Sequence, residues 1–159
     1  MNKHMQNATF KNANASVDFH WFNGSSNLHS HDYYELFVIF NGDFSHEYNG
    51  KTISLVKGDA VLIVPNKPHL LLANSKYGVH ANFSFTNEAF KTLTCDYGAE
   101  LADSLIKTTG QPFKISDEKL SFLENFINSL LLDSKMSDYC YLSIIHLLFA
   151  YFSIINDKK

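Results

Sequence analysis

The sequence contains no arginine, and all 13 of its basic residues are lysines. Arginine is the side chain that reads phosphate and guanine through two parallel hydrogen bonds, so its absence argues against nucleic-acid binding by this chain alone. The formal net charge of -3 is mild. Because a bidentate clamp for phosphate is lacking, an uncharged small ligand is favoured over a phosphorylated one.

Cysteines and long apolar runs are also scarce. Cys95 and Cys140 are too few for a disulfide framework and do not have the spacing of a metal knuckle, which is typical of the reduced cytoplasm. The polar start of the chain has no apolar stretch of signal-peptide length. The apolar run Tyr139 to Ile155 is shorter than the ~18–20 residues of a membrane span. We therefore expect a cytoplasmic protein without membrane contact, in which this run is a buried helix.

The length and composition suit one domain. The chain has 159 residues, of which 45% are hydrophobic and 14% aromatic, enough to build a substantial core. From Ser16 to Phe85, short apolar segments recur between turn signals, which is the pattern of an all-β sandwich or barrel. The pair Asn49-Gly50 separates two such segments and supplies the positive φ angles of a type I′ hairpin turn.

After Thr86 the apolar period changes from two to about 3.6 residues. Ser116 is placed to cap a helix that runs to about Asp133, and Ser137 to cap a second helix that runs through Ile155. Strands followed by helices predict a mainly β fold with a C-terminal α segment. We divide the chain into a flexible arm (1–13), a barrel (14–86) and a helical segment (87–159).

One short stretch carries candidate chemistry. His29, His31 and Glu35 have the same parity, so on extended backbone their side chains point to one side. His69, which follows a turn rich in proline, is the candidate fourth member. Three imidazoles and a carboxylate suit a divalent ion such as Zn, Mn, Fe or Ni. The same groups can instead contact a ligand directly, or hydrogen-bond one another with no ion.

The spacing His29-x-His31-x3-Glu35-x6-Gly42 resembles the first motif of the cupin superfamily. The second motif is looser. Gly58 and His69 stand at matching positions, but the usual proline, glycine and asparagine are replaced by Val64, Asn66 and Ala73. The resemblance implies a cupin-type jelly-roll β-barrel, and these replacements weaken the interpretation as a metalloenzyme.

The stretches from His31 to Gly42 and from Gly58 to His69 resemble the N-terminal domain of AraC-type transcription regulators. The segment His31-Asp32-Tyr33-Tyr34-Glu35 is especially similar to regulators of chitobiose and cellobiose operons. The resemblance implies a barrel that binds a small effector, commonly a sugar, and helices that pair two protomers. It also implies a C-terminal DNA-binding domain, which we expect to be absent from this chain because no pair of helix-turn-helix patterns follows Phe113.

Aromatic residues on the predicted strands are candidates for stacking on a sugar ring. Parity with Glu35 places Tyr33 and Phe37 inside the barrel and Tyr34 outside. The predicted ligand-binding residues are His29, His31, Tyr33, Glu35, His69, Trp21, Phe37 and Phe83. The remaining histidines of the folded part lack partners at a ligand spacing, so we interpret them as surface or hydrogen-bonded side chains: His20, His46, His80 and His146.

These observations favour ligand sensing without catalysis. The leading hypothesis is that a mono- or disaccharide enters the barrel, a homodimer forms through the C-terminal helices, and DNA is reached only through a separate domain. The alternative is a stand-alone metal-dependent cupin enzyme of the sugar isomerase or dioxygenase type, with His29, His31, Glu35 and His69 as metal ligands. A third hypothesis is a purely structural dimerisation module.

Overall fold

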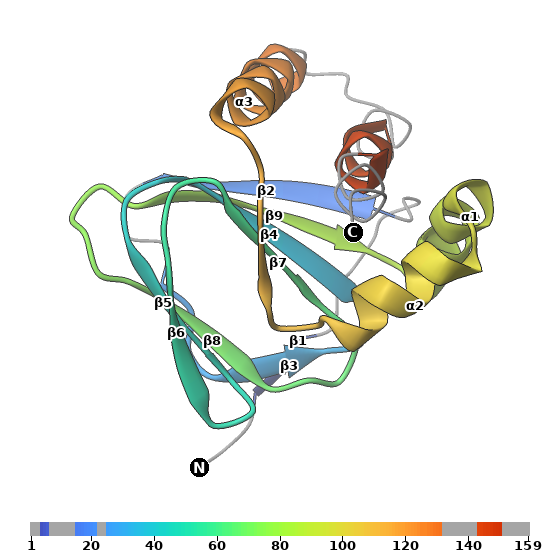
Figure 1. Cartoon of the computed structure of the whole chain (residues 1–159). Coiled ribbons are helices and arrows are strands. Elements are labelled where there is room, and N and C mark those ends of the chain that lie inside the picture. The colour runs from blue at the N-terminus through green and yellow to red at the C-terminus, as the bar shows by residue number, and fades with distance from the viewer. Residues whose placement is uncertain (1–3, 7–14, 22–24, 132–142, 151–159) are drawn as a thin grey trace.

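The computed structural model describes residues 4–6, 15–21, 25–131 and 143–150. Within these residues the chain forms two five-stranded sheets that face each other, one of order β1-β3-β8-β5-β6 and one of order β10-β7-β4-β9-β2 (Figure 1). The strands of the first sheet are β1 (His4–Gln6), β3 (His29–His31), β8 (His69–Ala73), β5 (Phe44–Tyr48) and β6 (Lys51–Leu55). The strands of the second are β10 (Pro112–Lys114), β7 (Asp59–Ile63), β4 (Tyr34–Asn41), β9 (Val79–Phe85) and β2 (Ala15–Trp21).

The predicted hairpin is confirmed. β5 and β6 pair antiparallel, with Tyr48 opposite Lys51, around a turn in which Asn49 has φ 52° and Gly50 has φ 72°. Two consecutive positive φ angles are the requirement of a type I′ turn, which asparagine and glycine meet at low cost. The turn therefore sets the register that points Phe44, His46 and Tyr48 to the inside of the barrel.

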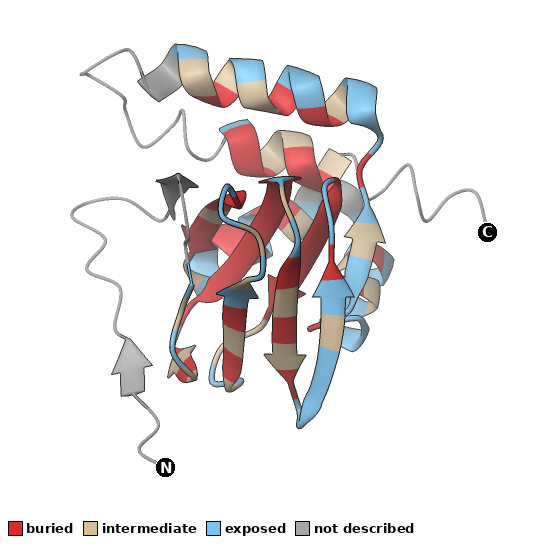
Figure 2. Cartoon of the chain, turned by 90° about the vertical axis from the view of Figure 1, so that its left-hand side faces the viewer, coloured by how far each residue is buried: buried red, intermediate tan, exposed pale blue. Residues whose placement is uncertain are grey.

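Helices cover the outer face of the second sheet. They are α1 (Asn87–Tyr97), α2 (Ala99–Lys107), α3 (Asp117–Leu131) and a helical segment at 143–150. Figure 2 shows their inner faces buried and the outer face of α3 exposed. The core on this side joins residues of β4 and β9 to helix residues such as Leu93, Leu123 and Phe149. A mainly β fold with α-helices after the barrel, as predicted, is the result.

The helix boundaries agree with the capping signals where the chain is described. α3 begins after Ser116, whose Oγ accepts the backbone N–H of Lys119 at 3.5 Å. Of the helix predicted from Ser137 through Ile155, residues 143–150 are helical and the remainder lies outside the described part of the chain. No helix of the described residues has the length and apolar character that crossing a membrane requires.

Two strands depart from the predicted division of the chain. β1 lies within the segment predicted as a flexible arm and pairs parallel with β3, His4 opposite His29. β10 lies within the segment predicted as helical and pairs antiparallel with β7, Phe113 opposite Ala60. Three-residue strands are too short to show a period of two, so the sequence pattern did not reveal them. The rest of the predicted arm lies outside the described residues.

Candidate functional site

The four predicted cluster residues come together inside the barrel. His29 and His31 come from β3, Glu35 from β4 and His69 from β8, and all four side chains are buried. His29 lies directly opposite His69 in the antiparallel pair of β3 and β8. One potential ligand atom from each residue lies within 4.8 Å of the others. The predicted single extended stretch from His29 to Glu35 is wrong, because the chain bends after His31 and enters β4 of the facing sheet. The site therefore forms from the β3–β8 pair on one sheet and Glu35 on the other.

The turn before β8 keeps its shape despite the replaced motif residues. Asn66, which stands where the cupin motif has glycine, adopts φ 63°. Asparagine is one of the few residues that tolerate this left-handed region. The backbone N–H of Asn66 also donates to the carbonyl oxygen of His31 at 2.7 Å. The replacement therefore preserves the turn that brings His69 to the cluster.

Backbone carbonyl groups hold the three imidazoles in one orientation. Each ring directs Nδ1 at a carbonyl oxygen two residues away; the pairs are His29 with Asn27 at 2.7 Å, His31 with Tyr33 at 2.7 Å and His69 with Lys67 at 3.1 Å. A carbonyl oxygen can only accept, so Nδ1 of each ring carries the hydrogen. Nε2 of each ring is then the nitrogen available to the cluster. In His31 and His69 it faces Oε2 of Glu35, and a bound cation would replace the proton between them.

Glu35 is the centre of the cluster. Its Oε2 lies 2.9 Å from Nε2 of His69 and 3.3 Å from Nε2 of His31, and its Oε1 accepts the side-chain N–H of Asn82 at 2.9 Å. Burial by itself raises the pKa of this carboxyl group, but the hydrogen bonds and charges of His69 and His31 outweigh it and lower the pKa. Glu35 is therefore a buried carboxylate at neutral pH.

Burial is the main influence on the titration of His29. Burial lowers the pKa of its imidazole, partly opposed by the hydrogen bond to Asn27. A neutral His29 keeps the lone pair on Nε2. The cluster thus offers a carboxylate and imidazole nitrogens of fixed orientation, a donor set that fits Zn, Mn, Fe or Ni.

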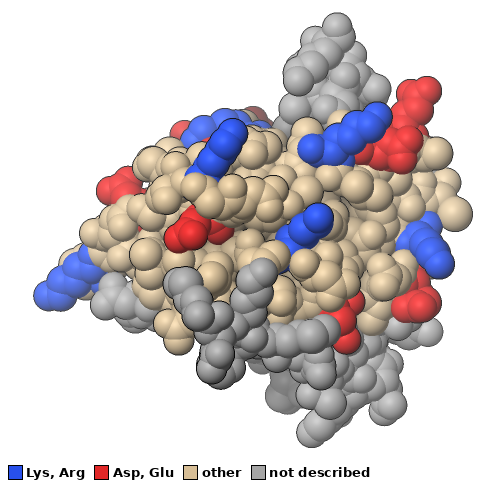
Figure 3. Space-filling view, turned by 90° about the horizontal axis from the view of Figure 1, so that it is seen from below, with Lys and Arg blue, Asp and Glu red and all other residues tan. Residues whose placement is uncertain are grey.

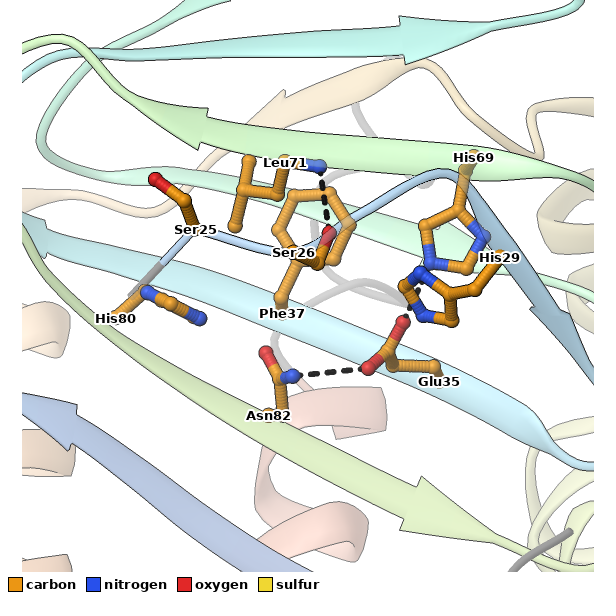
Figure 4. A pocket seen from close by; sticks show the side chains of 9 residues that line it. All are labelled: Ser25, Ser26, His29, Glu35, Phe37, His69, Leu71, His80 and Asn82. Atoms are coloured by element: carbon orange, nitrogen blue, oxygen red, sulfur yellow. Dashed lines mark hydrogen bonds and ion pairs between the residues drawn. The ribbon is translucent and has the colours of Figure 1, made fainter. Parts of the chain in front are cut away.

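A cavity of about 80 Å³ lies beside the cluster, inside the barrel. It is lined by Ser25, Ser26, His29, Glu35, Phe37, His69, Leu71, His80 and Asn82, which Figure 4 shows arranged around one space. Neither lysine nor any other permanently cationic side chain is among these lining residues. The cavity combines a carboxylate, an amide and two hydroxyl groups with the apolar surfaces of Phe37 and Leu71, a mixture typical of sites for small polar molecules.

The predicted aromatic residues occupy different environments in the structure. Phe37 lines the cavity. Tyr33 is buried, with its ring stacked on His31 at a centroid distance of 4.2 Å, and it is not part of the cavity lining. Trp21 lies in β2, where its backbone pairs with Val79 of β9. The side chain of Trp21 lies outside what the structure describes.

The prediction that Phe83 contacts a ligand inside the barrel is wrong. Phe83 is fully buried in the core between the second sheet and the helices, together with Leu36, Ala81 and Phe85. Apolar residues on alternate positions of β9 face the helices because that side of the sheet is the one covered by the larger apolar core. The polar residues of the same strand, such as Asn82, face the cavity.

Sequence reasoning missed several residues around the cavity. Asn82 and His80 line it from β9, and Ser25 and Ser26 line it from the segment before β3. His46, interpreted as a surface or hydrogen-bonded residue, has no exposed surface and lies in the barrel with its ring 6.2 Å from that of His69. A signal was present in β9, where polar residues occupy alternate positions from 80 to 84 and stand in register with the inward face of β4.

A second hollow lies outside the barrel. It measures about 340 Å³ and is lined by Leu28, Glu47, Asn49, Gly50 and Pro68, next to the hairpin turn. These residues bring no buried cluster of polar groups to one point.

The face shown in Figure 3 carries lysines interspersed with acidic residues, with no extended patch of positive charge on that face.

A two-sheet barrel with helices on one side and a buried His/Glu cluster inside defines a cupin-type ligand-binding domain. Residues 19–111 match the family described as the AraC-like ligand binding domain, and the chain belongs to that family. This agrees with the predicted AraC-type domain and its cupin fold. No curated protein matches the chain.

Solved structures of AraC-type proteins have a similar fold. A lysine-to-alanine variant of apo ToxT from Vibrio cholerae strain SCE256 has a TM-score of 0.62 and 15% identity, over 92% of this chain and 56% of that one. The AraC-like transcriptional activator CuxR has a TM-score of 0.53 and 13% identity, over 76% of this chain and 42% of that one. A cupin-like protein from Thermotoga maritima has 29% identity, over 50% of this chain, with a TM-score of 0.45. The chain therefore spans little more than half the length of ToxT.

Proposed function

We propose that this chain is the effector-binding part of an AraC-type transcription regulator, and that its effector is an uncharged mono- or disaccharide bound inside the barrel. The observation that carries the proposal is the cavity beside Glu35. Its wall offers hydrogen-bond acceptors and hydroxyl groups around the apolar faces of Phe37 and Leu71. A carbohydrate has the complementary surface, because it presents hydroxyl groups at its edge and C–H groups on its faces.

The charges of the cavity support an uncharged ligand. Glu35 is a buried carboxylate, and the described lining residues include no lysine to balance an anionic ligand as well. A buried charge without a partner is strongly disfavoured, so a sugar phosphate or sugar acid is a poor fit unless a bound cation offsets it. The resemblance of residues 31–35 to regulators of chitobiose and cellobiose operons agrees with a neutral sugar.

The rest of the regulatory mechanism lies in the helices and beyond this chain. We propose a homodimer through the C-terminal helices, supported by Phe122 of α3, which is 56% exposed and stacks on Phe126 at a centroid distance of 6.2 Å. DNA contact then belongs to a C-terminal domain outside this chain, and the regulator acts in the cytoplasm without catalysing a reaction. The sugar shifts the equilibrium between two arrangements of the dimer only if it binds one of them more tightly than the other.

A thermal-shift screen against mono- and disaccharides, free and phosphorylated, tests the effector class. At about a hundredfold excess over its Kd, a ligand adds about 2.7 kcal/mol to the free energy of unfolding and raises Tm by several degrees. We expect such a rise with a neutral sugar and none with its phosphate. The variant His29→Ala removes a cavity wall and should lose the rise, while Glu47→Gln on the outer face of β5 should keep it. Absence of any rise with all sugars contradicts the proposal.

A metal-dependent enzyme is the second candidate, and one observation favours it. The donor atoms of His29, His31, Glu35 and His69 lie within 4.8 Å of one another in a buried site. These four residues would hold a divalent ion, which would act as a Lewis acid or bind an oxygen ligand in isomerase or dioxygenase chemistry. Elemental analysis of protein purified without chelators checks this candidate. One equivalent of metal together with turnover of a sugar supports the enzyme, whereas sugar binding without turnover supports the sensor.

A further inference from the structure

His46 is a buried histidine that the site described above does not use. It has no exposed surface, and neither ring nitrogen has a hydrogen-bond partner among the described residues. Its surroundings are the ring of Phe37 at 5.2 Å, that of Tyr48 at 6.1 Å and that of His69 at 6.2 Å. Buried polar atoms are almost always paired, so an imidazole with two unpaired nitrogens calls for an explanation.

Phe37 stands between His46 and the cavity. In the second sheet, Phe37 lies directly opposite Asn82 on one side and Val61 on the other. In the first sheet, His46 lies directly opposite Leu71. Asn82, Phe37 and Leu71 line the cavity and His46 does not. The ring of Phe37 meets that of His46 edge to face, at an angle of 71°. Phe37 therefore separates the cavity from His46 on the side of the second sheet, and Leu71 and His69 do so on the side of the first.

Asn82 carries a second unpaired polar atom on the near side of Phe37. Its Nδ2 donates to Glu35, and its Oδ1 is buried without a hydrogen-bond partner among the described residues. Figure 4 shows the amide oxygen directed away from Glu35, beside Phe37 and His80. Because a carboxylate only accepts, the amide cannot turn round without losing its bond to Glu35. Unpaired groups thus lie on both sides of Phe37, namely Asn82 Oδ1 and the two nitrogens of His46.

The size of the cavity agrees with a site that is closed by this ring. Its volume of about 80 Å³ is several times smaller than the ~300 Å³ at the lower end of ordinary ligand pockets. A sugar ring needs more space than the cavity offers, and, within the described part of the chain, unpaired polar atoms lie both in its lining, on Asn82, and beyond Phe37, on His46. Rotation of the Phe37 side chain would open a way from the cavity to His46.

We propose that the effector site extends past Phe37 to His46, and that a monosaccharide ring displaces Phe37 and hydrogen-bonds to both His46 and Asn82. This extension rests on the carbohydrate effector proposed above. Burial lowers the pKa of His46 to about 4, so the ring is neutral at pH 7 and presents one donor and one acceptor. A sugar hydroxyl group pairs with either nitrogen, whereas an apolar ligand pairs with neither. Leu71 then covers the apolar face of the sugar.

The test compares variants of the two residues by calorimetric titration with free hexoses and pentoses. His46→Phe fills the same space without hydrogen bonds, and we expect it to fold and to weaken binding of the best monosaccharide by about tenfold or more. His46→Gln keeps a donor and an acceptor and should retain much of the affinity. Phe37→Ala opens the wall in advance and should bind as tightly as the wild type or more tightly. Glu47→Gln, on the outer face of the same strand, is the control for folding and affinity.

A spectroscopic readout separates contact from a structural role. In a long-range ¹H–¹⁵N spectrum, the His46 nitrogens, assigned by their loss in His46→Gln, should shift when the sugar saturates the wild-type protein. Binding by His46→Phe with the wild-type Kd, together with unshifted His46 nitrogens, overturns the extension and leaves the carbohydrate proposal standing. Failure of both the wild type and Phe37→Ala to bind any of these monosaccharides overturns the extension and the monosaccharide effector together.

Discussion

Asn82 donates its side-chain amide to Oε1 of Glu35 at 2.9 Å, and this bond joins the cavity to the His/Glu cluster. The other carboxylate oxygen faces His69 and His31, so each oxygen of Glu35 has its own partners. A ligand that contacts the Asn82 amide therefore acts on the same side chain that orients Glu35. This contact is a physical route by which ligand binding in the cavity alters the cluster.

Asn82→Ala should destabilise the domain as well as weaken ligand binding. The variant leaves Oε1 of Glu35 without its donor, and loss of one partner of a buried polar pair costs about 1–3 kcal/mol of unfolding free energy. Denaturant unfolding measures this change. Asn74→Ala is the matched control, because the Asn74 amide donates to Ser45 at the exposed surface and its loss should cost much less. Equal losses of unfolding free energy in the two variants would show that the Asn82–Glu35 hydrogen bond contributes no more than an exposed one.

Glu35→Gln should have a larger effect. The variant keeps the shape of the side chain but removes the carboxylate that faces two buried imidazoles. Loss of a hydrogen bond to a buried charged group typically costs about 1.5–3 kcal/mol, whereas an exposed pair contributes at most about 1 kcal/mol. Asp117→Asn, which breaks the exposed pair with Lys57, is the matched control. Urea unfolding at pH 7 compares them, and a Glu35→Gln effect as small as the control would contradict the buried site.

Phe83 and Phe37 lie on opposite faces of the second sheet, and substitutions should separate their roles. Phe83→Leu leaves a cavity in the core beneath the helices, so it should lower the free energy of unfolding by about 1–3 kcal/mol. It should leave the Kd for sugar unchanged, since Phe83 does not line the cavity. Phe37→Leu should change the Kd. Calorimetric titration of the two variants checks this, and a changed Kd in Phe83→Leu alone would reverse the assignment of the faces.

The stability of metal-free protein should fall between pH 6.5 and pH 4. Burial lowers the pKa of His46 from 6.5 to about 4. In this interval the unfolded chain takes up a proton on His46 that the folded chain does not, so acid favours unfolding by roughly 3 kcal/mol. His29, whose pKa burial also lowers, contributes in the same direction. Because the pKa of Glu35 is lowered in the folded protein, the stabilisation by its carboxylate is lost only when the pH falls below the ordinary pKa of a glutamate.

His46→Phe should flatten this part of the curve without abolishing it. The variant removes one of the two histidines with lowered pKa and leaves His29 in place. Chemical unfolding at several pH values, with a chelator present, measures the slope for both proteins. An identical slope in the wild type and in His46→Phe would mean that His46 titrates alike in the folded and unfolded chain.

The sequence predicted the β-to-α order and the three clustered histidines from short-range rules. Glu35 lies on β4 of the facing sheet, so its approach to the histidines depends on how the two sheets pack. Alternation along β3 places His29 and His31 on one side, and a proline-rich turn marks the strand that begins with His69. Those rules hold within one strand and need no knowledge of the partner strand. The Asn49-Gly50 turn was predictable for the same reason.

The remainder of the site depends on which sheet face the helices cover. Alternation on β9 separates Phe83 from Asn82 but does not say which of them faces the barrel. The burial of His46 arises from its pairing with β8 and from Phe37 on the opposite sheet, contacts between residues far apart in the sequence. Such placement follows from tertiary packing, which a single sequence does not display.

A crystal structure of the chain with the sugar that raises Tm most tests the central claim most directly. The account predicts electron density for the sugar inside the barrel, within hydrogen-bond distance of Asn82 and next to Glu35. Density in the outer hollow between Leu28 and Glu47, with the barrel cavity unchanged, would contradict it.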